Sequence, residues 1–216
     1  MNNMRNLINR LIKIELEAYY VVELDLEGFV PPKFRQIDHS IVKLSNKNTD
    51  IGELVEFWPD DYRFGRNNEK IKMAIRSHFK DGDECFLAMV DGEIAGMLWV
   101  GYQGNYMLKD MVQKDGLGSK EAIIHRAYVS TKFRGYNLHA HLSSHIKSYL
   151  KEKGYKRTRG YIGINNLASI LNTIKTNDRY KTLYHLKIKF LRKQFNIFPN
   201  YTSRWTKLKK PRPIAT

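Results

Sequence analysis

The sequence predicts an α/β fold of mixed α+β order, a twisted mixed β-sheet flanked by helices, with an N-terminal helical extension. Two apolar segments, residues 84–90 and 93–101, are joined by Asp91-Gly92, a dipeptide that favours a tight hairpin turn. Beyond residue 120, strand-like and helix-like segments alternate, as they do in folds that contain parallel strands. At the start of the chain, apolar residues recur at helical spacing and predict the extension.

The individual elements follow from the same periodicities. Helical spacing predicts a helix over residues 1–17, and the apolar run at residues 19–22 predicts a short strand. Further strands are expected at residues 39–44, 84–90, 93–101, 120–129, 155–162 and 181–191. Further helices are expected from the N-cap Asp50 to Phe57 and at residues 68–80, 138–153 and 166–176. We expect one domain over residues 1–202, with a helix and strand extension at 1–37 and a basic, mobile tail at 203–216.

Composition excludes several classes of protein. Hydrophobic residues make up 42% of the 216, which suits a folded core rather than a disordered chain. No apolar run approaches the length that spans a bilayer, and polar residues interrupt the first turns where a signal peptide is apolar. The single cysteine, Cys85, excludes an internal disulfide and favours a reducing compartment, so we expect a cytoplasmic protein.

The charge is strongly basic, with 37 Lys and Arg against 22 Asp and Glu and a net charge of +15. Such an excess favours an anionic partner, or reflects only a solvated basic surface. The partners left open are a phosphate-bearing small molecule, an anionic membrane surface touched by the N-terminal helix, and an acidic acyl-carrier protein. Nucleic acid is disfavoured because no recognised nucleic-acid module is present, and a homodimer stays open.

The most informative segment runs from Val129 to Ala140. A strand enters, the chain turns through Arg134-Gly135, and an amphipathic helix leaves with Leu138 on its buried side. The first amides of a helix have no partners within it, and the helix dipole adds positive potential there. The turn therefore predicts a site for a pyrophosphate, with Arg134 adding a charge-assisted contact.

This segment resembles the acyl-coenzyme A binding turn of the GNAT acetyltransferases, whose pattern is Gln/Arg-x-x-Gly-x-Gly/Ala. Arg134 stands at the first position, Asn137 at the Gly position and His139 at the Gly/Ala position. Asn tolerates left-handed backbone better than most residues, so it can replace Gly. His139 is bulky, and a register shift that puts Ala140 in its place would relieve the crowding.

A second segment, Asn166-Leu-Ala-Ser169, resembles the family's Asn-x-x-Ser/Ala at the start of the next helix, where Asn166 is the expected N-cap. The hairpin is also similar, so the resemblance covers about residues 38–190. It implies that acetyl-coenzyme A or another acyl-coenzyme A is the co-substrate. The cofactor-binding residues it implies are Ala127, Tyr128, Val129, Arg134, Gly135, Tyr136, Asn137, Leu138, His139, Asn166 and Ser169.

The resemblance implies an N-acyltransferase in which a small amine or amino-sugar acceptor attacks the thioester directly. Strand alternation puts Glu121 and His125 on one face with Ile123, Ala127 and Val129, and either can be the general base. Glu121 also fits a solvated charge, and His125 fits a hydrogen-bonded core histidine. The position of the family's tyrosine acid is occupied by Thr173.

Substrate binding is expected at Trp58 and Tyr62, in the polar and aromatic loop after the first short helix. The same residues also fit a surface loop with one packed Trp. We expect no metal site, because among His139, His141 and His145 only the last two share a helix face. The alternatives are a non-catalytic GNAT-like binding protein that uses its basic surface for a membrane or nucleic acid, transfer to a hydroxyl, and an acyl-carrier protein as donor.

Overall fold

The computed structural model describes residues 12–33, 37–44, 51–59, 67–102, 117–176, 178–190, 193–197 and 206–207. They fall into two compact units, which we call the main unit (Leu24–Arg159) and the terminal unit (Met1–Glu23 with Gly160–Thr216). Several predictions lie outside the described residues: the helix over residues 1–11, the N-cap Asp50, the candidate Tyr62 and most of the tail. None of the described helices is long and apolar enough to cross a membrane.

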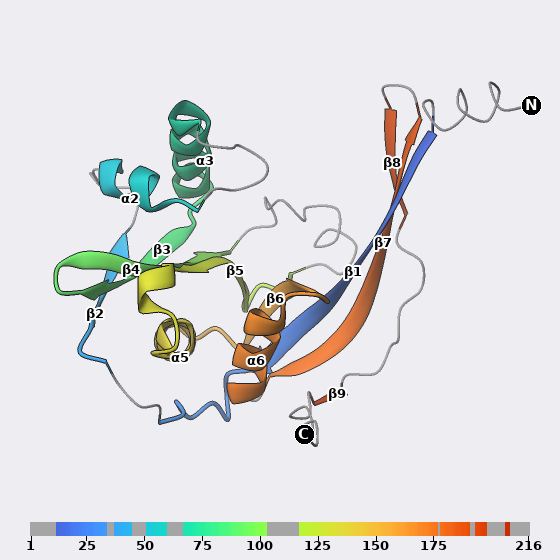
Figure 1. Cartoon of the computed structure of the whole chain (residues 1–216). Helices are drawn as coiled ribbons and strands as arrows, with labels where there is room; N and C mark the ends of the chain where they lie inside the picture. The colour runs from blue at the N-terminus through green and yellow to red at the C-terminus, as the bar shows by residue number, and fades with distance from the viewer. Residues whose placement is uncertain are drawn as a thin grey trace, which may run out of the picture. The chain divides into compact units, whose positions relative to one another are not determined.

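The main unit is built on a mixed sheet (Figure 1). Strands β2 (Ser40–Leu44), β3 (Glu84–Val90), β4 (Glu93–Gly101) and β5 (Glu121–Val129) pair antiparallel in that order. The first residues of β6 (Arg157–Gly163) then pair parallel to the start of β5. The bounds of β3 and β4 coincide with the predicted hairpin, and the predicted α/β class with a mixed sheet is confirmed.

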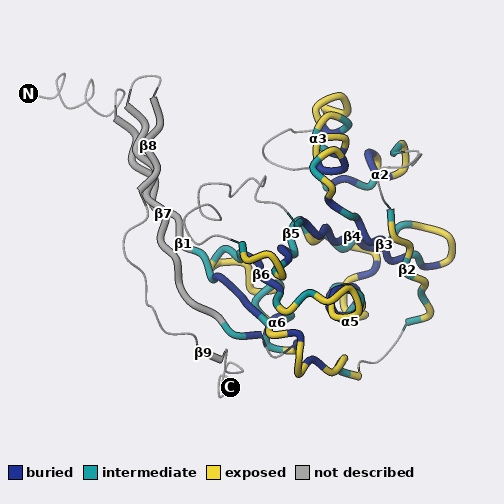
Figure 2. Tube along the Cα trace, turned by 180° about the vertical axis from the view of Figure 1, so that it is seen from behind, coloured by how far each residue is buried: buried dark blue, intermediate teal, exposed yellow. Residues whose placement is uncertain are grey.

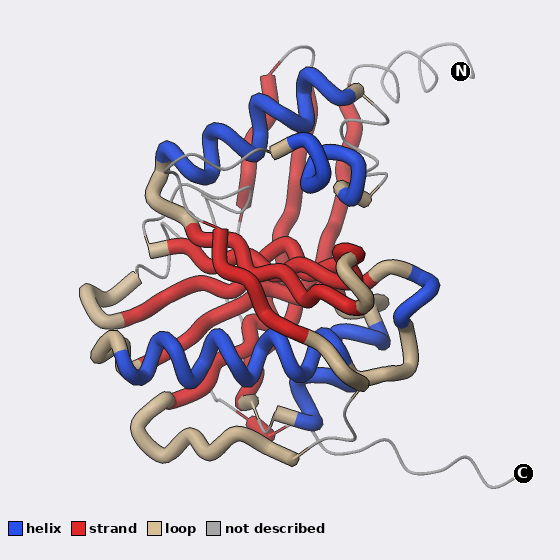
Figure 3. Tube along the Cα trace, turned by 90° about the vertical axis from the view of Figure 1, so that its left-hand side faces the viewer, coloured by secondary structure: helices blue, strands red, loops and turns tan. Residues whose placement is uncertain are grey.

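Helices cover both faces of this sheet (Figure 3). The α5 helix (Leu138–Glu152) lies on one face, where Leu142 packs with Phe86 and Ala88. The helices α2 (Gly52–Phe57) and α3 (Asn68–Lys80) lie on the other, where Ile75 packs with Leu87. Because successive strand residues point to opposite faces, β3 supplies side chains to both cores. Figure 2 shows β3 and most of β4 as buried.

The terminal unit contains a long antiparallel pair. Strand β1 (Ile12–Asp25) pairs with β7 (Arg179–Phe190) in a continuous register from Ile12 opposite Phe190 to Glu23 opposite Arg179. Two further strands, β8 (Lys193–Ile197) and β9 (Thr206–Lys207), pair with β7, and α6 spans Leu167–Lys175. Strands β8 and β9 were not predicted, and β9 gives part of the predicted tail a fixed partner.

The predicted helix over residues 1–17 is wrong for residues 12–17, which belong to β1. The segment IKIELE alternates apolar and charged residues, a strand pattern that overlaps the helical spacing before it. The extended conformation is favoured because every residue from Ile12 to Glu23 finds a ladder partner in β7.

Candidate functional site

The turn between β5 and α5 has the conformation expected of an anion-binding loop. A short 3-10 turn, η1 (Thr131–Phe133), leads into Gly135 with φ of 90°, and Asn137 has φ of 60° as the N-cap of α5. Asn137 thus takes the left-handed backbone that the Gly position of the motif demands. Phe133 and Leu138 are both buried in the core on the α5 side, so packing holds the turn at both ends.

The backbone N–H groups in the first turn of α5 point toward the N-terminal end of the helix. The first bond of the helical ladder runs from the amide of His141 to the carbonyl of Asn137, at 3.0 Å. Amides earlier in the first turn of a helix have no carbonyl one turn behind them, and the helix dipole adds to their positive potential. Gly135 and Tyr136 next to them are exposed, so an anion can approach the turn from solvent.

Arg134 and His139 flank this turn. The side chain of Arg134 is exposed, and its Nε donates to the carbonyl of Val129 at 3.3 Å, which holds the guanidinium over the end of β5. Ala140 is fully buried in the core, so the proposed register shift does not occur. His139, which is partly buried, keeps the second small position of the motif.

Strand β5 carries a bulge where the motif predicts contacts to the thioester arm. His125 lies opposite Trp99 and Tyr128 opposite Met97, so Arg126 and Ala127 together face a single residue of β4. Arg126 takes a φ of 48°, a strained value for a residue with a side chain. Ala127 is exposed beside it.

The bulge overturns the predicted alternation. His125 and Tyr128 both lie on the α2/α3 face, where their rings contact Trp99 and Phe57. Val129 packs on the opposite, α5 face. The expectation that Val129 shares a face with His125 is therefore wrong, because the extra residue shifts the side-chain pattern by one.

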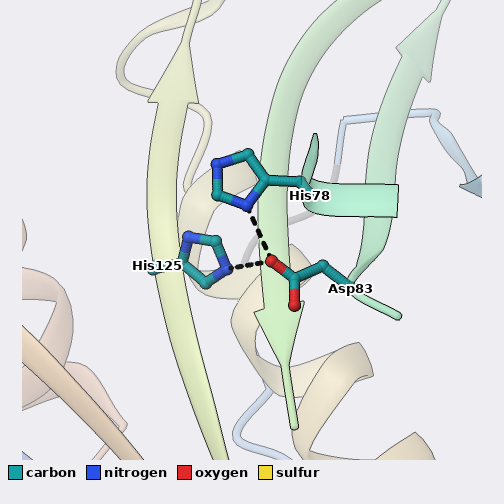
Figure 4. Close-up of side chains that lie close together, drawn as sticks. All are labelled: His78, Asp83 and His125. Atoms are coloured by element: carbon teal, nitrogen blue, oxygen red, sulfur yellow. Dashed lines mark hydrogen bonds and ion pairs between the residues drawn. The ribbon is translucent and has the colours of Figure 1, made fainter. Parts of the chain in front are cut away.

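A buried cluster of His78, Asp83 and His125 lies on the α2/α3 face (Figure 4). His78 comes from the last turn of α3, Asp83 directly precedes β3, and His125 is in the middle of β5. Oδ2 of Asp83 lies 2.7 Å from Nδ1 of His78 and 3.4 Å from Nε2 of His125. The Asp83 side chain is 1% exposed and that of His125 is 14% exposed.

Arg126 sets the tautomer of His78. Its Nε lies 3.0 Å from Nε2 of His78. A guanidinium can only donate, so Nε2 of His78 accepts and the ring carries its proton on Nδ1, facing Asp83.

The surroundings of Asp83 and His125 shift the pKa values of both side chains. Burial alone would raise the pKa of Asp83, but the hydrogen bonds from His125 and His78 lower that pKa below its ordinary value. Burial lowers the pKa of His125 to about 4; the interaction with Asp83 opposes this shift, and the neighbouring His78 ring and the Arg126 guanidinium add to it. At neutral pH His125 is thus an uncharged imidazole that can accept a proton, beside a carboxylate that can support the resulting charge.

The same three side chains are of the kinds that bind metal ions, and their ligand atoms lie within 4.8 Å of one another. Arg126 disfavours that use. A metal on Nδ1 of His78 would move the ring proton to Nε2, where it would face the Nε–H of Arg126. The guanidinium charge would also repel a cation at this distance.

Glu121, the other candidate base, is occupied by ion pairs. Its carboxylate lies 2.9 Å from Nη1 of Arg157 and 3.4 Å from Nη2 of Arg159, both on β6. Its Oε2 also accepts from the amide of Gly118 at 3.1 Å. These contacts join β5 to the parallel strand β6, so they give Glu121 a structural task.

Trp58, the predicted substrate contact, is packed rather than exposed. It is 5% exposed, its ring lies 6.3 Å from that of Trp99, and the guanidinium carbon of Arg126 lies 5.1 Å over it. Among the described residues, Nε1 of Trp58 has no hydrogen-bond partner. Trp58 therefore borders the His78, Asp83 and His125 cluster.

In the terminal unit, the predicted N-cap of α6 is confirmed. The side chain of Asn166 accepts from the amide of Ser169 at 3.1 Å. Thr173, at the position of the family's tyrosine, donates its hydroxyl to the carbonyl of Ile170 at 2.7 Å.

Sequence reasoning missed Asp83 and the role of His78. A histidine on the apolar side of the predicted helix 68–80, followed by an aspartate just before a strand, was the only available indication. Neither residue lies in a recognisable motif, and the cluster forms only when α3, β3 and β5 pack together.

These features define an α/β protein in which a bulged strand is followed by a turn with a left-handed N-cap residue at the start of a helix. The sequence profile of the acetyltransferase (GNAT) family matches residues 51–171, more than half of the chain. The chain therefore belongs to the GNAT acetyltransferase family, whose members transfer acyl groups. No curated protein matches it by sequence.

Solved structures show the same fold at low identity. A GCN5-related N-acetyltransferase from Sphaerobacter thermophilus is similar with a TM-score of 0.59 and 14% identity, over 88% of this chain and 56% of that one. A functionally unknown protein from Staphylococcus epidermidis has a TM-score of 0.56 and 16% identity, over 88% and 66%. A glucosamine N-acetyltransferase region of a fungal multi-domain β-N-acetylglucosaminidase is similar with a TM-score of 0.52 and 12% identity, over 90% of this chain and 22% of that one. The chain spans between 22% and 66% of these proteins' own lengths.

Proposed function

We propose that this protein is an N-acyltransferase that moves an acetyl group from acetyl-coenzyme A to a small amine or amino sugar. The observation that carries the proposal is the turn at residues 134–140, where left-handed Asn137 opens a helix start toward solvent. Such a turn suits the pyrophosphate of coenzyme A, and Arg134 at its edge adds a positive charge.

The chemistry requires the acceptor amine to attack the thioester while a base removes its proton. His125 fits this task better than Glu121, because it is uncharged at neutral pH while Glu121 is held by two arginines. The bulge exposes Ala127 just beyond His125, so the backbone of residues 127–129 can bind the thioester arm next to the base.

Cofactor binding tests the proposal directly. Acetyl-coenzyme A should raise the melting temperature of the protein, and Arg134→Glu should abolish most of that rise. Lys72→Glu is the matched control, because it reverses a charge in a surface pair on α3. If no acyl-coenzyme A shifts the melting temperature of the unaltered protein, the proposal fails.

Acceptor class is tested by release of the coenzyme A thiol from acetyl-coenzyme A with glucosamine, spermidine and a lysine-containing peptide. Glucosamine is included because the fungal structural neighbour is named for that acceptor.

The free and buried Cys85 suits a reducing cytoplasm, which we propose as the location.

A second candidate function is a non-catalytic binding protein of the same fold. Thr173 favours it, because a hydroxyl bonded to its own helix replaces the family's tyrosine acid. The net charge of +15 would then serve an anionic membrane or an acyl-carrier protein. Salt-sensitive pelleting with anionic vesicles that is lost on deletion of residues 1–11, without acetyl-coenzyme A binding, would support this candidate.

A further inference from the structure

We propose that Asp83 is a positioning residue for His125, and that Nδ1 of His125 is the atom that takes the proton from the acceptor amine. The inference rests on the proposed acyl transfer and assigns the atoms of its proton step. Its basis is the geometry of the cluster in Figure 4, in which one carboxylate oxygen faces a nitrogen from each of two histidines.

The carboxylate of Asp83 has no proton to donate, so it can hold the rings of His78 and His125 only by accepting hydrogen bonds from them. Oδ2 of Asp83 already receives the Nδ1 proton of His78, because Arg126 occupies the other nitrogen of that ring. Nε2 of His125, 3.4 Å from the same oxygen, is then favoured as a protonated nitrogen, since a lone pair there would face a negative charge. The lone pair of His125 consequently lies on Nδ1, which Figure 4 shows turned away from Asp83.

Asp83 is well placed to keep this orientation. Its side chain is 1% exposed, and its own amide donates to the carbonyl of His78 at 3.0 Å, which ties it to the end of α3. The backbone of Asp83 is therefore fixed at the junction between α3 and β3, and its buried carboxylate is held by the Nδ1 proton of His78. Within the part of the chain that the structure describes, the charged or titratable groups that act on His125 include His78 from α3, Asp83 before β3, and Arg126 from β5.

The bulge explains why this base lies near the reacting atoms. An undistorted strand would turn Arg126 to the face opposite His125. Because Arg126 adopts a positive φ, it reaches His78 on the same face as His125, and the chain beyond it is displaced outward at Ala127. The strained backbone at Arg126 thus brings its side chain to His78 and leaves the backbone at Ala127 exposed.

The proton step balances within the proposed reaction. The amine nitrogen forms a bond to the thioester carbonyl carbon, and one amine proton passes to Nδ1 of His125. The carbon–sulfur bond then breaks, and the thiolate of coenzyme A leaves with the electron pair. His125 returns its proton to the sulfur, so the products are the amide and the free thiol, and the imidazole is restored. Asp83 stabilises the imidazolium that exists between the two transfers.

The test combines kinetics with nitrogen NMR on the full chain. Asp83→Asn should lower kcat for acetyl transfer to glucosamine or spermidine by about 100-fold with little change in the KM for acetyl-coenzyme A. His125→Gln should lower kcat by a similar factor, and the double variant should lower it no further, because the two residues act as one device. Glu84→Gln is the matched control, because it removes a neighbouring, partly buried carboxylate that bonds Lys43 and Tyr149 instead.

Histidine labelled with ¹⁵N gives the second readout. In the unaltered protein, His125 should be protonated on Nε2 and bare on Nδ1 at neutral pH, and Asp83→Asn should abolish this preference. A bare Nε2 in the unaltered protein overturns the inference, as does an Asp83→Asn variant with unchanged kcat. If acetyl-coenzyme A does not bind at all, the proposed function fails, while the tautomer of His125 still decides the arrangement of the cluster.

Discussion

Arg126 donates a hydrogen bond from Nε to Nε2 of His78 across 3.0 Å, although strict strand alternation would turn it to the other face of the sheet. The contact depends on the bulge in β5, where Arg126 has a φ of 48°. The local strain of one residue is thus offset by contacts to His78 and, 5.1 Å away, to the ring of Trp58.

Replacing Arg126 separates the strain from the contacts. Arg126→Gly and Arg126→Ala both remove the guanidinium, but only Ala retains the steric cost of a positive φ. We expect the Gly variant to have a free energy of unfolding about 1 kcal/mol higher than the Ala variant, measured by urea denaturation. Equal stabilities would mean that residue 126 does not adopt a left-handed backbone in solution.

Stability should depend on pH through His125. Its pKa is about 4 in the folded chain against an ordinary 6.5, so between these values the unfolded chain binds a proton that the folded chain does not. The free energy of unfolding should therefore fall as the pH drops from 6.5 to about 4, by at most about 3 kcal/mol, and level off below.

His125→Gln is the control for this slope, because it removes the titrating group. Asp83 does not interfere in the same window. Its pKa is lowered from 3.8, so the stability that it contributes is lost only as the pH falls through values below that. A slope between pH 6.5 and 4 that persists in His125→Gln would assign the effect to another group.

The local elements could be predicted from the sequence because their causes are local. The Asp91-Gly92 turn sets the β3–β4 hairpin, and the apolar stripe beginning at Leu138 sets α5. The segment at residues 12–17 could not be assigned in the same way. Its alternation suits a strand, its neighbours suit a helix, and the deciding partner, β7, lies at the far end of the sequence.

The candidate site was predicted only where it follows a motif. The turn around Asn137 has a recognisable pattern, and its left-handed residue was expected from the replacement of Gly by Asn. The bulge at Arg126 arises from the pairing of β4 with β5, and the residues of neither strand indicate where it falls. His78 and Asp83 meet His125 only through tertiary packing, so no spacing in the sequence reveals them.

The left-handed conformation of Asn137 gives a test of the turn itself. Asn137→Gly should preserve both stability and acetyl-coenzyme A binding, because Gly adopts a φ of 60° without steric cost. Asn137→Val should lower the free energy of unfolding by about 1 to 2 kcal/mol and weaken binding, since a β-branched residue resists this backbone. Thermal shifts with and without acetyl-coenzyme A measure both effects, and unimpaired binding by the Val variant would contradict the assignment of the turn.

Glu121 and His125 can be distinguished by which property each variant changes. Glu121→Gln leaves Arg157 and Arg159 without their shared carboxylate at the junction of β5 and β6. Because the Glu121 side chain is only 13% exposed, we expect a loss of about 2 kcal/mol in the free energy of unfolding. If His125 is the base, kcat of the folded Glu121→Gln variant should stay within about threefold of the unaltered enzyme. If Glu121 only anchors β5 to β6, its replacement should lower the stability and leave the proton transfer nearly unchanged. A loss of kcat by about 100-fold with unchanged stability would instead make Glu121 the base.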